Sequence, residues 1–273
     1  MNNKVLLTGS NGYLGSHIKR ALLKSGFEVI TLGRSDADIL WSLESSLVKE
    51  ISGATTLIHC AWDMKISCES ENYRINVEGT KNLVNSCISL GVSKIIFIST
   101  TSAYEGTQSV YGQTKFEIEK WLEQFQAIIV RPGLLWGSES GSMMQALFKI
   151  VTRLPIIPVF GARQLFYMTE VEALSVAIVQ LIQDCSLYRK DFPVIASSKP
   201  IAFIDLLKVL ARRSNKKRIF IAVPWRPIYW LFLLIEKMGF KPPFKSDSLI
   251  SLMTLCPNQK VNSKLLISDF KSS

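Results

Sequence analysis

The sequence predicts a doubly wound α/β fold, in which helices cover both faces of a parallel sheet, followed by a smaller, mostly helical C-terminal region. Three observations predict it. Short runs rich in Val, Ile and Leu recur without polar alternation, as strands buried on both faces require. Stretches with helical spacing separate these runs, so crossover helices join the strands. From about residue 199 onward, helical patterns follow one another with few strands, which marks the smaller region.

Six apolar runs predict the strands, and the helical stretches lie between and after them. The stretch at 71–91 ends at Gly91, a residue type that commonly stops helices. Another helix begins near residue 111, and two more are predicted at 203–213 and 226–239. The strand runs are KVLLT from residue 4, FEVITL from 27, TTLIHC from 55, KIIFIS from 94, AIIVRP from 127 and FPVIA from 192.

Composition indicates an ordinary globular protein and excludes several classes. At 273 residues and 48% apolar content, the chain can bury a full core. Its five cysteines form no C-x-x-C pair, and His17 and His59 are too few for a usual zinc set, so we predict a reducing compartment and no metal site. The N-terminus lacks a signal-peptide core, and the longest apolar run, at 228–235, is far below the roughly 20 residues that cross a bilayer. We therefore expect a cytoplasmic protein.

The net charge of +10 comes from the last quarter of the chain. Residues 199–273 hold 14 Lys or Arg and 4 Asp or Glu, whereas residues 1–198 hold 18 of each. This asymmetry favours an anionic partner for the C-terminal part: a phosphorylated substrate, a membrane surface or nucleic acid. The chain has no recognisable nucleic-acid-reading motif, so we expect no nucleic-acid partner.

Gly9, Gly12 and Gly15 follow the first strand directly and open a helix. Glycines there permit a tight turn and close backbone approach to a diphosphate, whose charge the helix N-terminus favours, so a dinucleotide site is predicted. After the second strand, where an acidic residue commonly holds the ribose, the chain has Arg34, whose guanidinium can pair with a 2′-phosphate or simply face solvent. Asp38 is a candidate contact for the adenine amino group. The predicted cofactor is NAD or NADP, with NADP favoured by Arg34.

Two tyrosines seven residues apart raise the question of which one moves a proton. Tyr111 and Lys115 lie four residues apart at the start of a helix, so their side chains share one face. A phenol has an ordinary pKa of about 10, which a neighbouring ammonium lowers by Coulomb attraction. Tyr104 has Gln108 at the same spacing, so only Tyr111 has such a neighbour. Thr100 can supply a hydroxyl that holds a substrate oxygen, although a Tyr–Lys pair alone is also compatible with an ordinary helix.

Several motifs together resemble those of the extended short-chain dehydrogenase/reductases, in order and spacing and over nearly the whole chain. They are TGSNGYLG from 8, HCA from 59, NVEGTKNL from 76, STTSAY from 99, YGQTK from 111 and RPGLLWG from 131. The resemblance is to the NAD-dependent epimerase/dehydratase branch in particular. It implies a Rossmann domain at 1–198, with a substrate-site excursion at about 134–168, and a small substrate-binding region at 199–273.

The resemblance also implies roles for single residues. Tyr111 is the catalytic acid/base, Lys115 binds the nicotinamide ribose and lowers the tyrosine pKa, and Thr100 orients the substrate. Tyr104 lines the substrate pocket and Trp136 forms a wall of it. The implied cofactor contacts are Gly9, Asn11, Gly12, Tyr13, Leu14, Gly15, Arg34, Asp38, Ile39, Cys60, Ala61, Trp62, Ser99, Tyr111, Lys115 and Pro132.

The chain departs from the sugar-nucleotide members of that family in two places. Only EGTQSV separates Tyr104 from Tyr111, where many members have a much longer segment that helps to cover the substrate, so we expect a more open site. Thr101 and Ser102 stand where sugar dehydratases have an Asp-Glu pair, which disfavours dehydration. With dehydration disfavoured, the remaining reaction is hydride exchange at a carbinol carbon, either as epimerisation or as keto-reduction.

The resemblance thus implies an NAD(P)-dependent enzyme acting on an activated sugar, nucleotide- or polyprenyl-diphosphate-linked, in surface-polysaccharide synthesis. A keto-reductase of a non-sugar substrate and a non-catalytic NAD(P)-binding subunit are the alternatives. The basic stretch at 211–218 and the aromatic-rich stretch at 223–240 suit either a small core or an interfacial helix, and the latter predicts peripheral contact with the inner face of a membrane. The resemblance also implies a homodimer.

Overall fold

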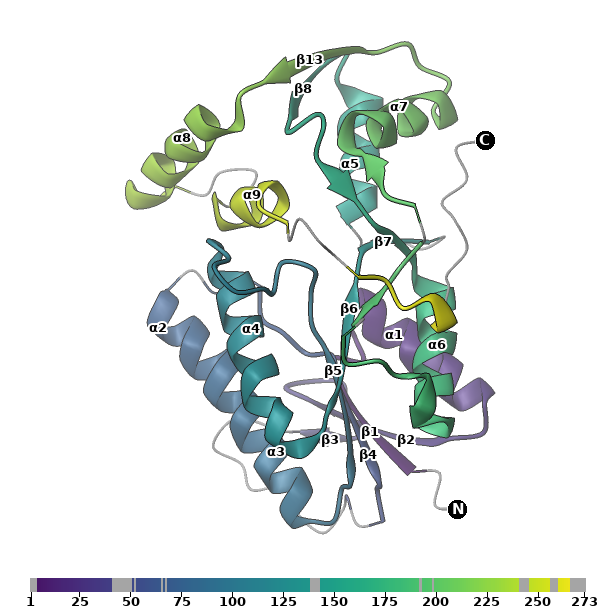
Figure 1. The fold of residues 1–273 in the computed structure, drawn as a ribbon. Coiled ribbons are helices and arrows are strands. Elements are labelled where there is room, and N and C mark those ends of the chain that lie inside the picture. Colours follow the sequence, from purple (N-terminus) through teal and green to yellow (C-terminus); the bar gives the residue numbers. More distant parts are fainter. Residues whose placement is uncertain are drawn as a thin grey trace.

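A parallel sheet covered by helices forms the larger part of the molecule, and a smaller layer of helices and short strands lies above it in Figure 1. The computed structural model describes residues 4–40, 51, 53–64, 66, 68–137, 143–191, 193–197, 199–240, 246–255 and 260–265. In this part of the chain the main sheet has the order β11-β6-β5-β4-β1-β2-β3, and each neighbouring pair is parallel. The doubly wound α/β class is confirmed. The strands are β1 (Lys4–Thr8), β2 (Glu28–Gly33), β3 (Ile39–Leu40), β4 (Thr56–His59), β5 (Lys94–Ile98), β6 (Ile128–Pro132) and β11 (Val194–Ile195).

Helices cover both faces of this sheet, because successive strand residues point to opposite sides. Val5 and Leu7 of β1 join a core with α1 and α6, whereas Leu6 between them joins a second core with α3 and α4 (Figure 1). The predicted stop at Gly91 is also observed, since this residue has φ of 93° just after α3. The elements are α1 (Tyr13–Lys24), α2 (Glu69–Asn72), a π-helical turn η2 (Tyr73–Glu78), α3 (Gly79–Ser89), α4 (Val110–Leu122), α6 (Val171–Gln183) and the 3₁₀ turns η3 (Glu123–Phe125), η4 (Cys185–Leu187) and η5 (Ser263–Leu265).

The smaller layer combines the excursion after β6 with the C-terminal region. Its core contains Leu147 and Val151 from the excursion together with Leu206 and Leu210 from beyond residue 199. The short strands of this layer were not predicted, because each pairs with a partner distant in sequence. They are β7 (Leu134–Trp136) with β10 (Met168–Glu170), β8 (Ile156–Phe160) with β13 (Ile219–Val223), and β9 (Leu165–Phe166) with β12 (Ile201–Ala202); the helices are α5 (Met143–Arg153), α7 (Phe203–Arg213), α8 (Trp225–Lys237) and α9 (Ser246–Met253).

After the smaller layer, the chain returns to the main sheet. Val261 forms a parallel bridge with Val194, and the Asn262 backbone N–H donates to the Val194 carbonyl at 2.9 Å. Leu265 packs into the core formed by α1, α6 and the sheet. Residues 260–265 therefore contact the sheet although the region that precedes them belongs to the other layer.

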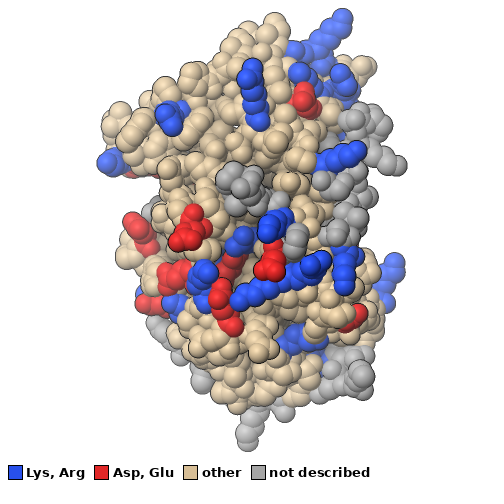
Figure 2. All heavy atoms as spheres, viewed as in Figure 1, with Lys and Arg blue, Asp and Glu red and all other residues tan. Residues whose placement is uncertain are grey.

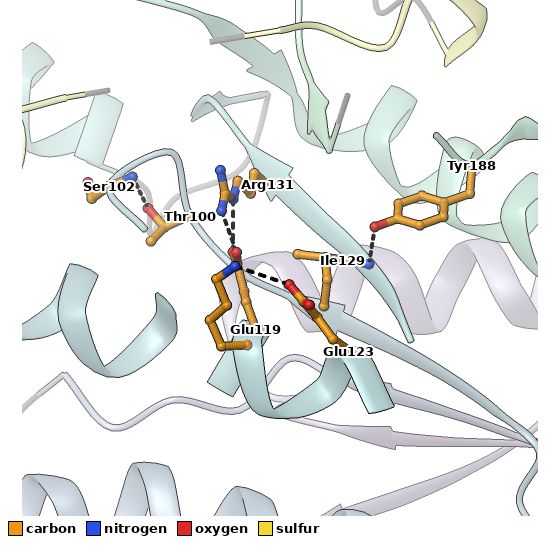
Figure 3. Close-up of polar contacts among 8 residues, drawn as sticks. Thr100, Ser102, Glu119, Glu123, Ile129, Arg131 and Tyr188 are labelled. Carbon is orange, nitrogen blue, oxygen red and sulfur yellow. Dashed lines mark hydrogen bonds and ion pairs between the residues drawn. The ribbon is translucent and has the colours of Figure 1, made fainter. Parts of the chain in front are cut away.

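A buried ion pair fixes α4 against the sheet. The Arg131 Nε of β6 donates to Glu119 Oε1 at 2.9 Å, and a second bond joins Arg131 Nη2 to Glu119 Oε2 (Figure 3). Both side chains are largely buried. Leaving one partner of such a pair alone costs about 3–5 kcal/mol, so the pair strongly restricts where α4 can lie. As a result the N-terminal half of α4, with Tyr111 and Lys115, faces the end of β5.

Candidate functional site

A cavity of about 740 Å³ lies where the central strands end. Thr8, His59, Ser99 and Pro132, from the carboxyl ends of β1, β4, β5 and β6 or just beyond, line it. This is the edge at which doubly wound sheets bind ligands, and the volume lies in the roughly 300–1,000 Å³ range of ligand pockets. The predicted cofactor contacts that line it are Gly9, Asn11, Gly12, Tyr13, Leu14, Gly15, Arg34, Cys60, Ala61, Trp62, Ser99, Tyr111, Lys115 and Pro132.

The glycine loop is packed directly against neighbouring backbone. Gly9 has φ of 72°, and a Cβ on it would lie 2.7 Å from the Ala61 backbone nitrogen. A Cβ on Gly15 would collide with the Gly9 carbonyl oxygen. Side chains at these positions would therefore push the loop away from the strand ends, and their absence lets the N-terminus of α1 reach the cavity.

The loop after β2 is tied to the loop after β4 by an ion pair. Arg34 Nη2 lies 2.9 Å from Asp63 Oδ2, although Arg34 itself is largely exposed. Asn76 holds the backbone of Asp63, accepting from its N–H at 2.8 Å and donating to its carbonyl at 3.1 Å. A guanidinium has five N–H donors, so this pairing still leaves donors for an anionic group in the cavity.

Asp38, a predicted cofactor contact, does not line the cavity. The Asp38 carboxylate accepts from the Thr31 backbone N–H at 2.8 Å and from its hydroxyl at 2.9 Å. These hydrogen bonds hold the pKa of Asp38 below its usual value. Asp38 thus fastens the turn after β2, which differs from the adenine contact assigned to it from the sequence. Ile39 is described only through its backbone, in β3.

Lys115 is buried in an aromatic setting, with 2% of its surface exposed. Its Nζ donates to the Ile98 carbonyl at 2.6 Å and lies 3.9 Å from the centre of the Trp62 ring and 4.5 Å from that of Phe97. Burial lowers the pKa of Lys115 to about 7, against the opposing charges of Cys60 and Glu119. The amine can therefore gain or lose a proton near neutral pH.

Tyr111 lies one turn before Lys115 on the same helix. Its ring is edge-on to that of Trp62, and the two ring centres are 6.4 Å apart. Burial raises the pKa of Tyr111 to about 12, and a hydrogen bond with the Thr100 side chain opposes the rise. The direction is opposite to that expected from the Tyr–Lys pair, because desolvation of the phenolate is the largest effect. Thr100 does not line the cavity itself; its Oγ1 accepts from the Ser102 backbone N–H at 3.2 Å (Figure 3).

The cavity contains a buried hydroxyl that needs a partner. Ser99 is 3% exposed and lines the cavity, and its Oγ has no hydrogen-bond partner among the described residues. Buried polar atoms are nearly always paired, so a bound molecule with a polar group at this point would satisfy it. With the close-packed glycine loop, this hydroxyl fits a polar ligand of dinucleotide size between α1 and α4.

His59 belongs to a buried hydrogen-bonded chain and does not act as a free base. Thr8 Oγ1 accepts from the Cys60 and Ala61 N–H groups at 3.1 Å each, so its proton points to His59 Nδ1, 2.7 Å away. His59 Nε2 then donates to Thr80 Oγ1 at 2.9 Å. This arrangement requires a neutral ring, and burial together with the Lys115 charge lowers the pKa of His59 to about 3.

Helix α9 covers the segment between β5 and α4. Asp247 accepts from the Val110 N–H at 2.6 Å and from the Tyr111 N–H at 3.3 Å, and Ser251 Oγ donates to Ser102 Oγ at 2.8 Å. The Tyr104 hydroxyl donates to the Thr254 carbonyl at 2.5 Å, so this tyrosine is an anchor for the C-terminal region and not a cavity wall. The short loop that favoured an open site is therefore covered by a distant helix.

The sequence patterns missed several cavity residues. Arg74 and Asn76 lie on the turn η2, Asp63 and Met64 follow β4, and Leu135 lies within β7. Of these, Arg74 adds a further basic residue to Arg34 and Lys115, but no motif marks it, because its position depends on how η2 winds. Trp136, expected as a wall, packs instead against the core of the smaller layer.

Comparison with known proteins shows that the chain is similar to one family model and to several curated enzymes. A family model described as RmlD substrate binding domain matches residues 3–192. Sterol-4-alpha-carboxylate 3-dehydrogenase, decarboxylating, of Dictyostelium discoideum is 30% identical over 58% of this chain, and UDP-glucose 4-epimerase of Vibrio cholerae is 25% identical over 87% of it and 83% of its own length. The chain spans about half the length of the first two curated relatives that it matches, 48% and 54%.

Solved structures share the fold over almost the whole chain. The crystal structure of dTDP-4-dehydrorhamnose reductase from Bacillus anthracis, in complex with NADP, aligns with a TM-score of 0.69 at 20% identity. The alignment covers 92% of this chain and 98% of that one. The likeness therefore includes the smaller layer as well as the parallel sheet.

We expect Asp247→Ala to lower the free energy of unfolding by about 1–3 kcal/mol, because two N–H groups at the start of α4 lose a charged acceptor. Urea denaturation of the full chain measures this. Asp205→Ala is the matched control, since Asp205 is also in the first turn of its helix but, among the described residues, pairs only with exposed Lys208. A loss in the control equal to that of Asp247→Ala would contradict the capping role.

When the pH is lowered from 7.5 to 5, titration of His59 alone should lower the free energy of unfolding by about 2 kcal/mol. Its pKa is about 3 in the folded chain against 6.5 for an ordinary histidine, so the unfolded chain takes up the proton first as the pH falls. Urea denaturation at both pH values measures the loss. His59→Gln, whose side chain cannot titrate, should lack this part of the pH dependence. A pH dependence equal to that of the unmodified chain would contradict the role given to His59.

Proposed function

The chain belongs to the RmlD substrate binding domain family, within the extended short-chain dehydrogenase/reductases, and from this premise we propose that it catalyses NAD(P)-dependent hydride transfer at a hydroxyl or ketone of an activated sugar. The observation that carries the proposal is the meeting of Tyr111, Lys115 and the unpaired Ser99 hydroxyl at one cavity beside the glycine loop. Tyr111 and Lys115 lie on α4, Ser99 directly follows β5, and the glycine loop directly follows β1.

The residues around the cavity fit a dinucleotide. Backbone N–H groups at the start of α1, behind Gly9 and Gly12, would bind its diphosphate. Lys115 and Ser99 would hold its ribose and nicotinamide end, and Arg34 would contact a 2′-phosphate where one is present. The bound group would supply or accept the hydride.

Tyr111 would move the proton that accompanies the hydride. With a pKa near 12 it keeps its proton at neutral pH, so its Oη can donate to a substrate carbonyl oxygen during reduction. In the reverse direction it must accept a proton from the carbinol as a phenolate. The hydrogen bond from Thr100 favours that phenolate, and the protonated form of Lys115, one turn away, would stabilise it by Coulomb attraction. The same residues therefore serve keto-reduction and epimerisation.

We further propose a sugar carried on a diphosphate, either nucleotide-linked or polyprenyl-linked, handled at the cytoplasmic side of surface-polysaccharide synthesis by a homodimer. Relatives named as a UDP-glucose epimerase and a dTDP-sugar reductase support the sugar class. The excess of Lys and Arg beyond residue 199 would attract the diphosphate. A keto-reductase of a non-sugar substrate is the second candidate, supported by the sterol-dehydrogenase relative. A non-catalytic subunit would not need Thr100, Tyr111 and Lys115 together.

Tyr111→Phe should reduce turnover about 10²–10⁴-fold, because it removes the proton donor, and should change dinucleotide affinity little. Reduced-nicotinamide absorbance with a panel of nucleotide-linked keto sugars gives the rate, and fluorescence titration gives the affinity. Tyr104→Phe is the matched control, since it removes a tyrosine hydroxyl bonded to Thr254. Equal losses of turnover in the two variants would argue against Tyr111 as the acid/base.

Arg34→Ala should weaken NADPH binding about tenfold and leave NADH binding within about twofold, because only NADPH carries the 2′-phosphate. Fluorescence titration of both reduced dinucleotides measures this. Asp63→Asn, which neutralises the partner of Arg34, should strengthen NADPH binding. An NADPH preference that persists in Arg34→Ala would rule out this residue as its cause, and no binding of either dinucleotide would overturn the proposed enzyme.

A further inference from the structure

Helix α8 carries an apolar stripe that faces solvent. Trp230 is 65% exposed, Leu231 49%, Leu234 56% and Met238, which caps the helix, 63%. These positions recur every three or four residues, so they form one continuous stripe along the helix. Phe240, just beyond the helix end, is 65% exposed as well.

The opposite side of α8 is already used. Helix α8 packs against α9, and no residue of α8 is fully buried. Glu236, the acidic residue of α8, accepts from the Ser246 N–H at 2.9 Å and from its hydroxyl at 2.5 Å. Its carboxylate is therefore turned toward α9, while the apolar stripe is on the side that α9 leaves uncovered.

The charge around the stripe is positive. Arg226 and Lys237 are exposed at the two ends of α8. The basic stretch at 216–218 lies at the far end of β13 from the helix and bonds to the end of α5, so the charge beside the stripe is that of Arg226 and Lys237. In Figure 2, Lys and Arg outnumber Asp and Glu over the smaller layer, in contrast to the mixed charges over the region around α4 below it.

We propose that α8 docks on the surface of a membrane that contains anionic phospholipids. A helix with Trp and Leu on one face and Lys or Arg beside them lies in the interface, with the apolar face among the upper acyl chains and the cations at the lipid phosphates. With 13 residues α8 is about 20 Å long, and in the described part of the chain no helix is long and apolar enough to cross a bilayer. The docked helix thus lies along the surface.

The positive rim selects this occupant over a second copy of the chain. Two copies paired through α8 would bring like charges at Arg226 and Lys237 close together, whereas a lipid surface with phosphate groups neutralises them. The inference goes beyond the proposed function, and it is tested without any substrate. If the chain has both the proposed function and this docking mode, α8 would bring the membrane surface next to α9, and therefore close to the start of α4.

Sedimentation of the full chain with vesicles tests the proposal. We expect binding to vesicles of phosphatidylcholine with one third phosphatidylglycerol, weakened by salt, and little binding to pure phosphatidylcholine. Leu231→Glu with Leu234→Glu should weaken binding at least tenfold. Arg226→Gln with Lys237→Gln should weaken it about 25-fold, since each cation near an anionic surface contributes about fivefold.

Leu23→Glu with Val176→Glu is the matched control, because it also places two glutamates at exposed apolar sites, on α1 and α6. The control should bind vesicles like the unmodified chain, and urea denaturation of every variant verifies folding without relying on the dinucleotide binding of the proposed function. Absent binding to anionic vesicles at low salt, or undiminished binding of the α8 variants, would overturn the proposal. A dimer in solution that dissociates on Leu231→Glu with Leu234→Glu, without vesicle binding, would assign the stripe to a second copy.

Discussion

The candidate site depends on the burial of one amine. Lys115 lines the cavity, and its Nζ is bonded to the Ile98 carbonyl and enclosed by Trp62 and Phe97. A buried ammonium is unfavourable without such partners, so the charged form of Lys115 is stabilised only while α4 holds the residue against the end of β5. The neighbouring pair of Glu119 with Arg131 fixes the same helix to β6. Because Tyr111 is one turn away, the constraint that satisfies the amine also positions the phenol.

The start of α4 links this buried centre to the far end of the chain. Ser109 accepts from the Gly112 N–H, and Asp247 accepts from the two N–H groups before it, so the first turn is capped by both a local and a distant residue. The distant cap lies on α9, which also contacts Ser102 and Tyr104. Ordering of α9 and of the turn that carries Tyr111 is therefore energetically coupled. A short loop before α4 is compatible with a covered site because α9 takes over the covering role.

Local sequence accounts for the fold class and for most of the cavity wall. Where predicted and observed contacts differ, the cause is a contact between residues distant in sequence or a local packing effect. Gly9 and Gly15 could be identified because their context after a strand leaves few structural choices. Asp38 could not be distinguished from an adenine contact, since its bonds to Thr31 depend on the turn after β2. The Arg34 pairing with Asp63 joins two loops that only the sheet brings together. For Tyr111, spacing identified the neighbour correctly but gave no measure of desolvation, which reverses the direction of the pKa shift.

The environment of helix α8 is a further feature that sequence alone does not determine. Its residues are apolar on nearly every side, which is typical of a buried core helix, whereas helices that lie on membranes carry a polar face as well. Sequence periodicity alone therefore favours a core helix, and it does not reveal how much of the helix the fold leaves uncovered. The position of α9 reveals this: it covers one side and binds Glu236, and the side with Trp230 and Leu234 stays open to solvent. An apolar surface of this kind is unfavourable in water, so its free energy is lowered only when a further surface covers it. Since α9 contacts both α8 and the start of α4, that covering surface would lie one helix away from Tyr111.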